Sequence, residues 1–259
     1  MKSTRLLVPG LVALLSSTAS PVSADVTLKS KSSGKGMVGA MVGDMTQYVK
    51  GTRTRTDQTA GAGKQTSTII DAAAQKMIVL DHDKKQADVL DMTAIGNSMA
   101  KAGMADMNVT ITPTNETRQI AGTACQVYDL KVVVPMQMGN GGMTMVMTGP
   151  QCLAKDAPGH ADFMAFYKAA SEKGFFLDPN QAKAQPAVAK AMADMQRRMS
   201  ELGVPLATEI TIAMDAGGPM AEMMKKMGST ITTEVTAIST AAIPDAMFEV
   251  PADYKVTKR

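Results

Sequence analysis

The first half of the chain consists of short runs in which apolar and polar residues alternate. Three such runs, separated by polar turns, are Gln65–Asp71, Lys76–Asp81 and Gln86–Asp91. Residues 46–57 also alternate, with Arg53 and Arg55 on a face that we expect to be exposed, unless these arginines pin a lid or an acidic ligand. Period-two alternation with intervening turns predicts an antiparallel meander. Further strands are expected at 25–33, 108–112, 116–120, 124–134, 205–214 and 231–239, whereas 37–45 fit either a strand or a loop.

The clearest hairpin signal is Asn140–Gly141, because Asn-Gly favours the type I′ turn of a two-residue hairpin. With these two residues at the tip, Met138 pairs with Met143. Side chains two residues apart on a strand share a face. One apolar patch is therefore expected to contain Met136, Met138, Met143, Met145 and Met147.

Helical spacing takes over in the second half. Residues 158–173 place Phe163, Phe166 and Tyr167 on one face, with Pro158 in the first turn. A second helix ends at Leu202, and its apolar stripe consists of Val188, Met192, Met195, Met199 and Leu202. A third, short helix at 219–227 is expected to align Met220, Met223, Met224 and Met227. Many strands with helices inserted late predict one α+β domain spanning 25–259.

The first 24 residues predict export. Lys2 and Arg5 precede a ten-residue apolar run, and small residues lead to Ala24. These are the three parts of a secretory signal peptide, and the run is shorter than the roughly 20 residues that span a bilayer. We therefore expect cleavage after Ala24, a periplasmic location and no stable membrane insertion.

Export changes how the charge and the cysteines are interpreted. The signal segment contains two basic and no acidic residues, so the net charge falls from +3 to +1 on cleavage. A nearly neutral chain with 3% aromatic residues is unlike a nucleic-acid-binding protein. Cys125 and Cys152 are expected to form a disulfide, because exported proteins meet oxidising conditions.

Two stretches carry a family resemblance. Residues 50–57 read Lys-Gly-Thr-Arg-Thr-Arg-Thr-Asp, and the runs 68–71 and 77–81 that follow each end in Asp. Near the C-terminus, 243–251 carry a Pro-Asp…Phe…Pro pattern followed by Tyr254. This arrangement resembles the LolA-like superfamily of exported proteins, close to its uncharacterised members. The resemblance implies an α+β half-barrel: a curved antiparallel β-sheet with helices packed on the concave face. It also implies a hollow, in which better-known members carry lipoproteins or sense lipidated ligands.

Signals for catalysis or for a resident metal are weak. Residues 60–66 miss phosphate-loop spacing, because Gln65 stands where Ser or Thr is required. Ser98 lies in a stretch that matches a nucleophile elbow only loosely. His82 and His160 lack zinc-ligand spacing, and we expect both in solvent. The sequence thus predicts a protein that is not an enzyme and has no cofactor or metal site.

Methionine is the strongest compositional signal, with 24 residues in a chain without tryptophan. Its polarizable thioether adapts to variable apolar shapes. We expect the hairpin patch, the aromatic residues of the first helix and the methionines of 219–227 to line one hollow. This hollow would bind an apolar small molecule, a lipid or a lipidated protein. Two alternatives are Cu(I) binding by the hairpin thioethers, since soft ligands select Cu(I), and a structural envelope protein with a closed core.

Export predicts a defined mature terminus. N-terminal sequencing of the secreted protein should begin at Asp25, because the small residues before it form the cleavage site. Mature protein that retains Met1 would contradict both the cleavage and the periplasmic location.

Overall fold

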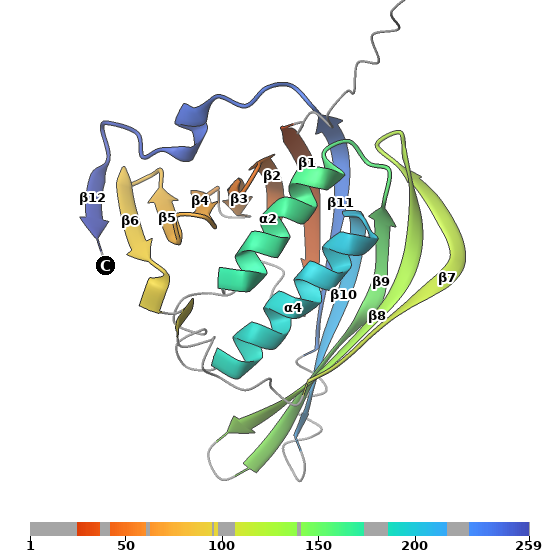
Figure 1. Ribbon diagram of the computed structural model, residues 1–259. Coiled ribbons are helices and arrows are strands. Elements are labelled where there is room, and N and C mark those ends of the chain that lie inside the picture. The colour runs from red at the N-terminus through yellow and green to blue at the C-terminus, as the bar shows by residue number, and fades with distance from the viewer. Residues whose placement is uncertain are drawn as a thin grey trace, which may run out of the picture.

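The computed structural model describes residues 25–36, 42–60, 63–94, 96–97, 107–138, 141–173, 186–216 and 228–258. This part of the chain forms one twelve-stranded sheet (Figure 1). Its strands are β1 (Val26–Lys35), β2 (Gly43–Lys50), β3 (Arg53–Ala60), β4 (Gln65–Asp71), β5 (Lys76–Asp81), β6 (Gln86–Asp91), β7 (Asn108–Ile120), β8 (Thr123–Met138), β9 (Gly141–Ala154), β10 (Val204–Ala216), β11 (Ser229–Ser239) and β12 (Lys255–Lys258). The spatial order is β12-β6-β5-β4-β3-β2-β1-β11-β10-β9-β8-β7. Neighbours are antiparallel except β12, which pairs in parallel with β6.

The predicted meander is confirmed for β4, β5 and β6, whose ends match the three alternating runs. The single strand expected at 46–57 is wrong. A tight turn at Gly51–Thr52 separates β2 from β3, and Gly51 has a φ of 57°, a backbone conformation that glycine adopts at no steric cost. Residues of the two kinds continue to alternate across this turn, so the sequence pattern did not reveal it.

The predicted hairpin exists, but its register is wrong. Met136 pairs with Met143, and Val134 pairs with Met145. The chain therefore turns between Met138 and Gly141, and Asn140 lies outside the described residues. The correction shifts the pairing by two positions, so the same positions still share a face.

Two helices, α2 (His160–Lys173) and α4 (Pro186–Leu202), lie side by side over one face of the sheet (Figure 1). Both confirm predicted helices, and α2 buries Phe163 and Phe166 as expected. The whole predicted stripe of α4 belongs to one hydrophobic cluster with β8 and β9. The third expected helix, at 219–227, and its four methionines lie outside the described residues. Neither α2 nor α4 is long and apolar enough to cross a membrane.

The expected fold class, an α+β half-barrel with helices packed on its concave face, is wrong. The described part of the chain is mainly β, and α2 and α4 are its only helices longer than one turn. These two neighbouring helices lie over part of one face of the sheet and do not form a helical layer across it (Figure 1). The sequence pattern underestimated the strand content, because strands continue where local propensity predicts a break. β7 runs through Pro113, a residue that edge strands and bulges tolerate.

Strands β4 and β5 bury apolar side chains on both faces. Ile70 packs in a cluster with Phe163 of α2, whereas its neighbour Ile69 packs in a cluster with Phe248 near the C-terminus. We call these the helix face and the strap face of the sheet. The strap is the segment 240–254, which contains the single-turn helix η3 (Asp245–Phe248) and leads into β12.

Arg53 and Arg55 attach this strap to β3, so they do not form the exposed face that was expected. Arg53 Nη2 donates to Asp245 Oδ1 at 2.6 Å, and its guanidinium lies 4.8 Å from the centre of the Phe248 ring. Arg55 Nη1 donates to the Met247 carbonyl at 3.0 Å. Hydrogen bonds from Arg53 and Lys50 lower the pKa of Asp245. Both arginines thus hold the strap against the sheet.

The predicted disulfide between Cys125 and Cys152 is confirmed, with a Cα–Cα distance of 5.3 Å. In the β8–β9 register Cys152 pairs with Val127, so Cys125 is its diagonal neighbour. Both sulfurs belong to buried residues on the face opposite the hairpin methionines. The bond therefore links β8 to β9 on the face that does not carry the hairpin methionines.

Removing the disulfide should destabilise the protein. The double variant Cys125→Ala, Cys152→Ala is expected to lose roughly 3–4 kcal/mol of unfolding free energy, because the bond closes a long loop in the unfolded chain. Urea unfolding of the variant and of the oxidised wild type measures the difference. Equal midpoints, or free thiols in unreduced denatured wild type, would contradict this.

Candidate functional site

A cavity of about 380 Å³ lies between the two helices and the helix face of the sheet. Its volume falls in the range of ~300–1,000 Å³ typical of small-molecule sites. Strands from both halves of the chain line the cavity. The pairing of β1 with β11 brings β2 and β3 into the same sheet as β9 and β10. The lining residues are Leu28, Ser30, Met45, Gln47, Thr56, Leu130, Met147, Gln151, Phe163, Tyr167, Met192, Met195, Gln196, Met199, Pro205, Leu206, Thr208, Ile210, Thr233 and Val235.

Methionine forms much of the cavity wall. Met45 comes from β2, Met147 from β9, and Met192, Met195 and Met199 from α4. Met195 and Met199 are buried, whereas the other three are half-buried. Unbranched thioether side chains fit irregular apolar shapes at little cost. The wall can therefore repack around ligands of different shape.

Tyr167 brings a hydroxyl group to this wall. Its ring contacts Phe163 and Phe166, with ring centroids 4.7 and 5.2 Å apart. Burial raises the pKa of Tyr167, and a hydrogen bond with Gln47 of β2 partly offsets this effect. The phenol is therefore neutral at physiological pH, and it joins α2 to the sheet at the edge of the cavity.

Three of the predicted site residues line the cavity: Met147, Phe163 and Tyr167. Phe166 is buried in the adjoining core cluster, and Met145 packs against the cluster formed with α4. Met143 is buried, and it is not among the residues that line the cavity. For Met136 and Met138 only the backbone is described, and Met220, Met223, Met224 and Met227 lie outside the described residues.

The cavity also contains residues that were not predicted for the site. The stripe of α4 was expected to face a core, but Met192, Met195 and Met199 line the hollow itself. Helical periodicity identifies an inward face, and it does not say whether that face meets other side chains or an open space. Polar lining residues such as Gln47 and Thr56 gave no sequence signal, because alternating threonines and glutamines are ordinary in strands.

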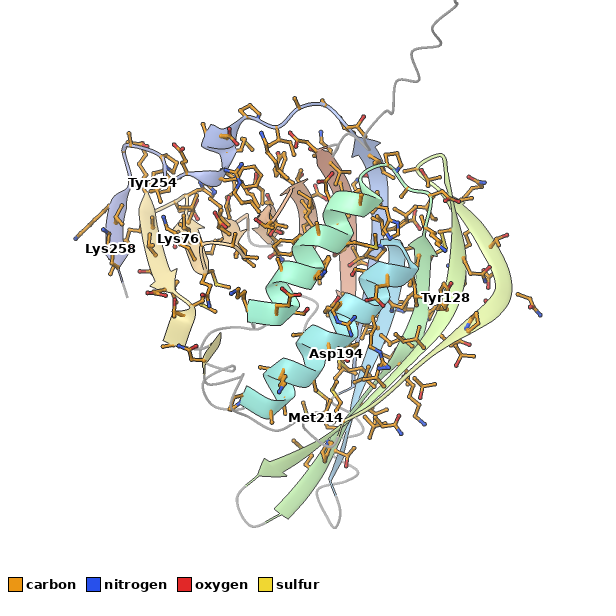
Figure 2. The ribbon with its side chains drawn as sticks, viewed as in Figure 1. Lys76, Tyr128, Asp194, Met214, Tyr254 and Lys258 are labelled. Atoms are coloured by element: carbon orange, nitrogen blue, oxygen red, sulfur yellow. A yellow bond between two sulfur atoms is a disulfide. The ribbon has the colours of Figure 1, made fainter. Side chains whose placement is uncertain are left out.

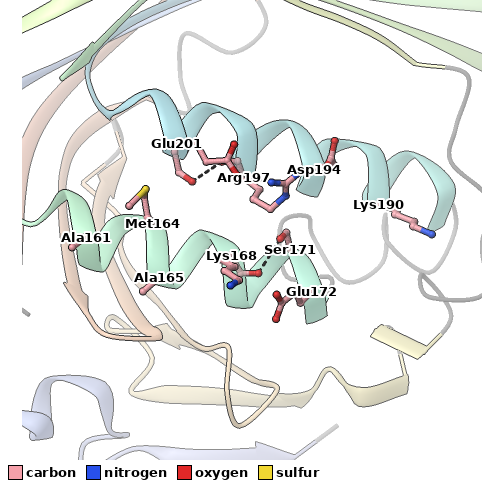
Figure 3. A pocket seen from close by; sticks show the side chains of 11 residues that line it. Ala161, Met164, Ala165, Lys168, Ser171, Glu172, Lys190, Asp194, Arg197 and Glu201 are labelled. Carbon is pink, nitrogen blue, oxygen red and sulfur yellow. Dashed lines mark hydrogen bonds and ion pairs between the residues drawn. The ribbon is translucent and has the colours of Figure 1, made fainter. Parts of the chain in front are cut away.

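A second hollow is the open groove between the outward surfaces of α2 and α4, with a volume of about 890 Å³ (Figure 3). Its side chains are largely charged, and Arg197 of α4 is paired with Asp194 at 2.7 Å and with Glu201. Small residues such as Ala161 and Ala165 line the α2 side. The groove is open, and its side chains come only from the two helices. The cavity between the helices and the sheet combines residues from α2, α4 and strands of the sheet, and it is the better candidate site.

A serine and a histidine meet beneath the strap. Ser67 Oγ lies 2.6 Å from His82 Nε2, and His82 Nδ1 lies 2.6 Å from the hydroxyl of Tyr254. Ser67 donates its only hydrogen to Asp57 Oδ1 at 2.5 Å, so His82 Nε2 donates to Ser67 Oγ. His82 is thus half-buried and hydrogen-bonded rather than solvated, contrary to expectation. Because Ser67 is fully buried and its proton is directed at Asp57, this group anchors the strap and does not form a nucleophile–base pair.

The buried phenol should make stability depend on alkaline pH. Tyr48 and Tyr167 both have raised pKa values, so their folded forms keep a proton that the unfolded chain releases above about pH 10. Unfolding free energy should hold below pH 10 and fall as the pH rises further. Tyr167→Phe should show a smaller loss between pH 9 and pH 11, as measured by urea unfolding at each pH. An unchanged loss in the variant would contradict the burial of this hydroxyl.

Comparisons with known proteins identify a family and distant structural neighbours. No curated protein matches the chain. Among solved structures, the chain is similar to one described as "Structure of PNGF-II in P21 space group", with 9% sequence identity and a TM-score of 0.35. That match covers 91% of this chain and 32% of the other, so this chain spans about a third of its length. Residues 35–172, more than half of the chain, match the family described as "Domain of unknown function (DUF4412)", and the chain belongs to this family.

Proposed function

We propose that this protein is a non-enzymatic periplasmic binding protein that holds an apolar ligand, a lipid or an acylated partner, in the cavity between the sheet and the helices. The observation that carries the proposal is the methionine wall. Five methionines from β2, β9 and α4 surround a space of about 380 Å³. A core that only needed to be rigid would favour Leu, Ile and Phe, whereas methionine accommodates variable ligands.

An empty apolar space is costly, and this supports occupancy. Side chains that line a void lose the dispersion contacts that a filled core supplies. Phe163 and Leu206 border the cavity and are almost fully buried, so this part of the lining is shielded from bulk solvent. A bound apolar ligand would restore the missing contacts.

Two further observations support the proposed compartment. The disulfide between Cys125 and Cys152 is of the kind that persists in oxidising environments outside the cytosol. The first 24 residues have the pattern of a secretory signal peptide.

The test uses the fluorescent apolar probe N-phenyl-1-naphthylamine. Wild type should bind the probe saturably, and Met192→Glu should weaken binding by about tenfold or more, because it places an unpaired carboxylate in the cavity. Met164→Glu is the matched control: Met164 lies on α2, is 37% exposed and faces the outer groove. The control should bind the probe like wild type.

Several outcomes would contradict the proposal. If Met192→Glu and Met164→Glu bind the probe equally, and circular dichroism shows that both are folded, the probe binds outside this cavity. Absence of saturable binding to wild type would favour a closed structural core. Stoichiometric copper in protein purified anaerobically would favour the Cu(I) alternative at the hairpin.

A further inference from the structure

The floor of the cavity carries a band of polar side chains. Six consecutive strands in the sheet order, β3, β2, β1, β11, β10 and β9, each contribute one uncharged polar residue to it. In strand order these residues are Thr56, Gln47, Ser30, Thr233, Thr208 and Gln151.

Strand pairing makes this band nearly continuous. Gln47 pairs directly with Thr56, and Thr208 pairs with both Thr233 and Gln151. Ser30 pairs with Met45 and Val235, each two residues from a band member, so Ser30 is the diagonal neighbour that connects the two halves. The cavity thus has methionine-rich walls, and a polar band crosses a floor that also contains apolar residues such as Leu28 and Val235.

Ser30 is the central member of the band, and its hydroxyl is unpartnered. The residue is 5% exposed, and its Oγ is buried without a hydrogen bond to any described residue. Burying a hydroxyl without a partner costs free energy, so native proteins rarely leave one unsatisfied. Ser30 also lines the cavity, but its Oγ is buried, so a ligand reaches this hydroxyl only when neighbouring side chains such as Met45 shift.

No described residue that lines the cavity is Asp, Glu, Lys, Arg or His. The one ionisable side chain, Tyr167, has its pKa raised by burial and is neutral. An ionised head group in this space would be desolvated without a counter-charge, which is far more costly than burying a neutral polar group with one hydrogen bond. The lining therefore selects against anions and cations alike.

We propose that the ligand is an uncharged amphiphile whose ester, amide or hydroxyl group meets the polar floor, with the Ser30 hydroxyl donating to its oxygen. This inference rests on the proposed function and narrows its ligand class. The apolar part of the ligand lies against the methionine wall of α4, and its polar part faces β1 and β2. Fatty acids in their ionised form and cationic amphiphiles are excluded.

The experiment compares three amphiphiles that share a twelve-carbon chain, each below its critical micelle concentration. Glycerol monododecanoate is neutral, dodecanoate is anionic and dodecyltrimethylammonium is cationic. Each amphiphile is titrated into wild type that carries bound N-phenyl-1-naphthylamine, and the loss of probe fluorescence is measured. We expect the neutral ester to displace the probe at a concentration lower by about tenfold or more than either ion.

Variants of Ser30 test the hydrogen bond itself. Ser30→Ala should weaken binding of the neutral ester by roughly three- to tenfold, after correction for the probe affinity of the variant itself, because the ester oxygen loses the hydrogen bond that this hydroxyl donates. Ser30→Thr keeps a hydroxyl and should retain most of the affinity. Ser33→Ala, three residues along β1 and on the other face of the strand, is the matched control and should behave like wild type.

The outcomes separate this inference from the proposed function. If the probe binds but the three amphiphiles displace it equally, or an ion does so better, the neutral-ligand inference is wrong and the apolar site stands. Unchanged ester affinity in Ser30→Ala would overturn the role of that hydroxyl. If the probe does not bind to wild type at all, the proposed function and this inference fall together.

Discussion

Both faces of the same strands must be covered in this fold. Neighbouring residues of β4, Ile69 and Ile70, point to opposite faces and are both apolar, and β5 repeats the pattern with Ile78 and Val79. A strand with period two that is apolar on both faces is stable only between two layers. The helix α2 supplies one cover, and the C-terminal strap supplies the other. The rest of the architecture follows from two features: how these covers are attached to the sheet, and where the helix cover no longer packs closely against it.

Burial holds the strap more than its ion pairs do. Ile243 and Phe248 are 4% and 7% exposed, and full burial of such side chains is worth roughly 1.5–3 kcal/mol each. The pair between Arg53 and Asp245 has a largely exposed carboxylate, and pairs of that kind contribute about 0–1 kcal/mol. The arginines therefore determine where the strap lies on the sheet, whereas burial of its apolar residues supplies most of the free energy that holds it there. Parallel pairing of β12 with β6 then completes the edge of the sheet.

The cavity lies where the helix face changes character. Near β4 and β5 this face is apolar and packs closely under α2, but toward β1, β10 and β11 it carries Ser30, Thr208 and Thr233. Apolar helix residues do not pack favourably against polar residues of the sheet, and methionines of α4 border the space between them. Figure 2 shows the described side chains on both sides of the sheet. A hollow with an adaptable wall and an uncharged polar floor suits a ligand with the same two parts.

Local pattern determined much of this protein. Periodicity alone located β4, β5 and β6, the extents of α2 and α4 and the inward stripe of α4, because each signal depends on residues within a few positions of one another. Oxidising export together with two cysteines predicted the disulfide. The turn at Gly51–Thr52, the hairpin register, the contacts of Arg53 and Arg55 with the strap and the composition of the cavity needed the tertiary structure. A pattern says which face of an element is apolar; which distant segment covers that face, and whether it fits closely or leaves a space, is decided only when the whole chain packs.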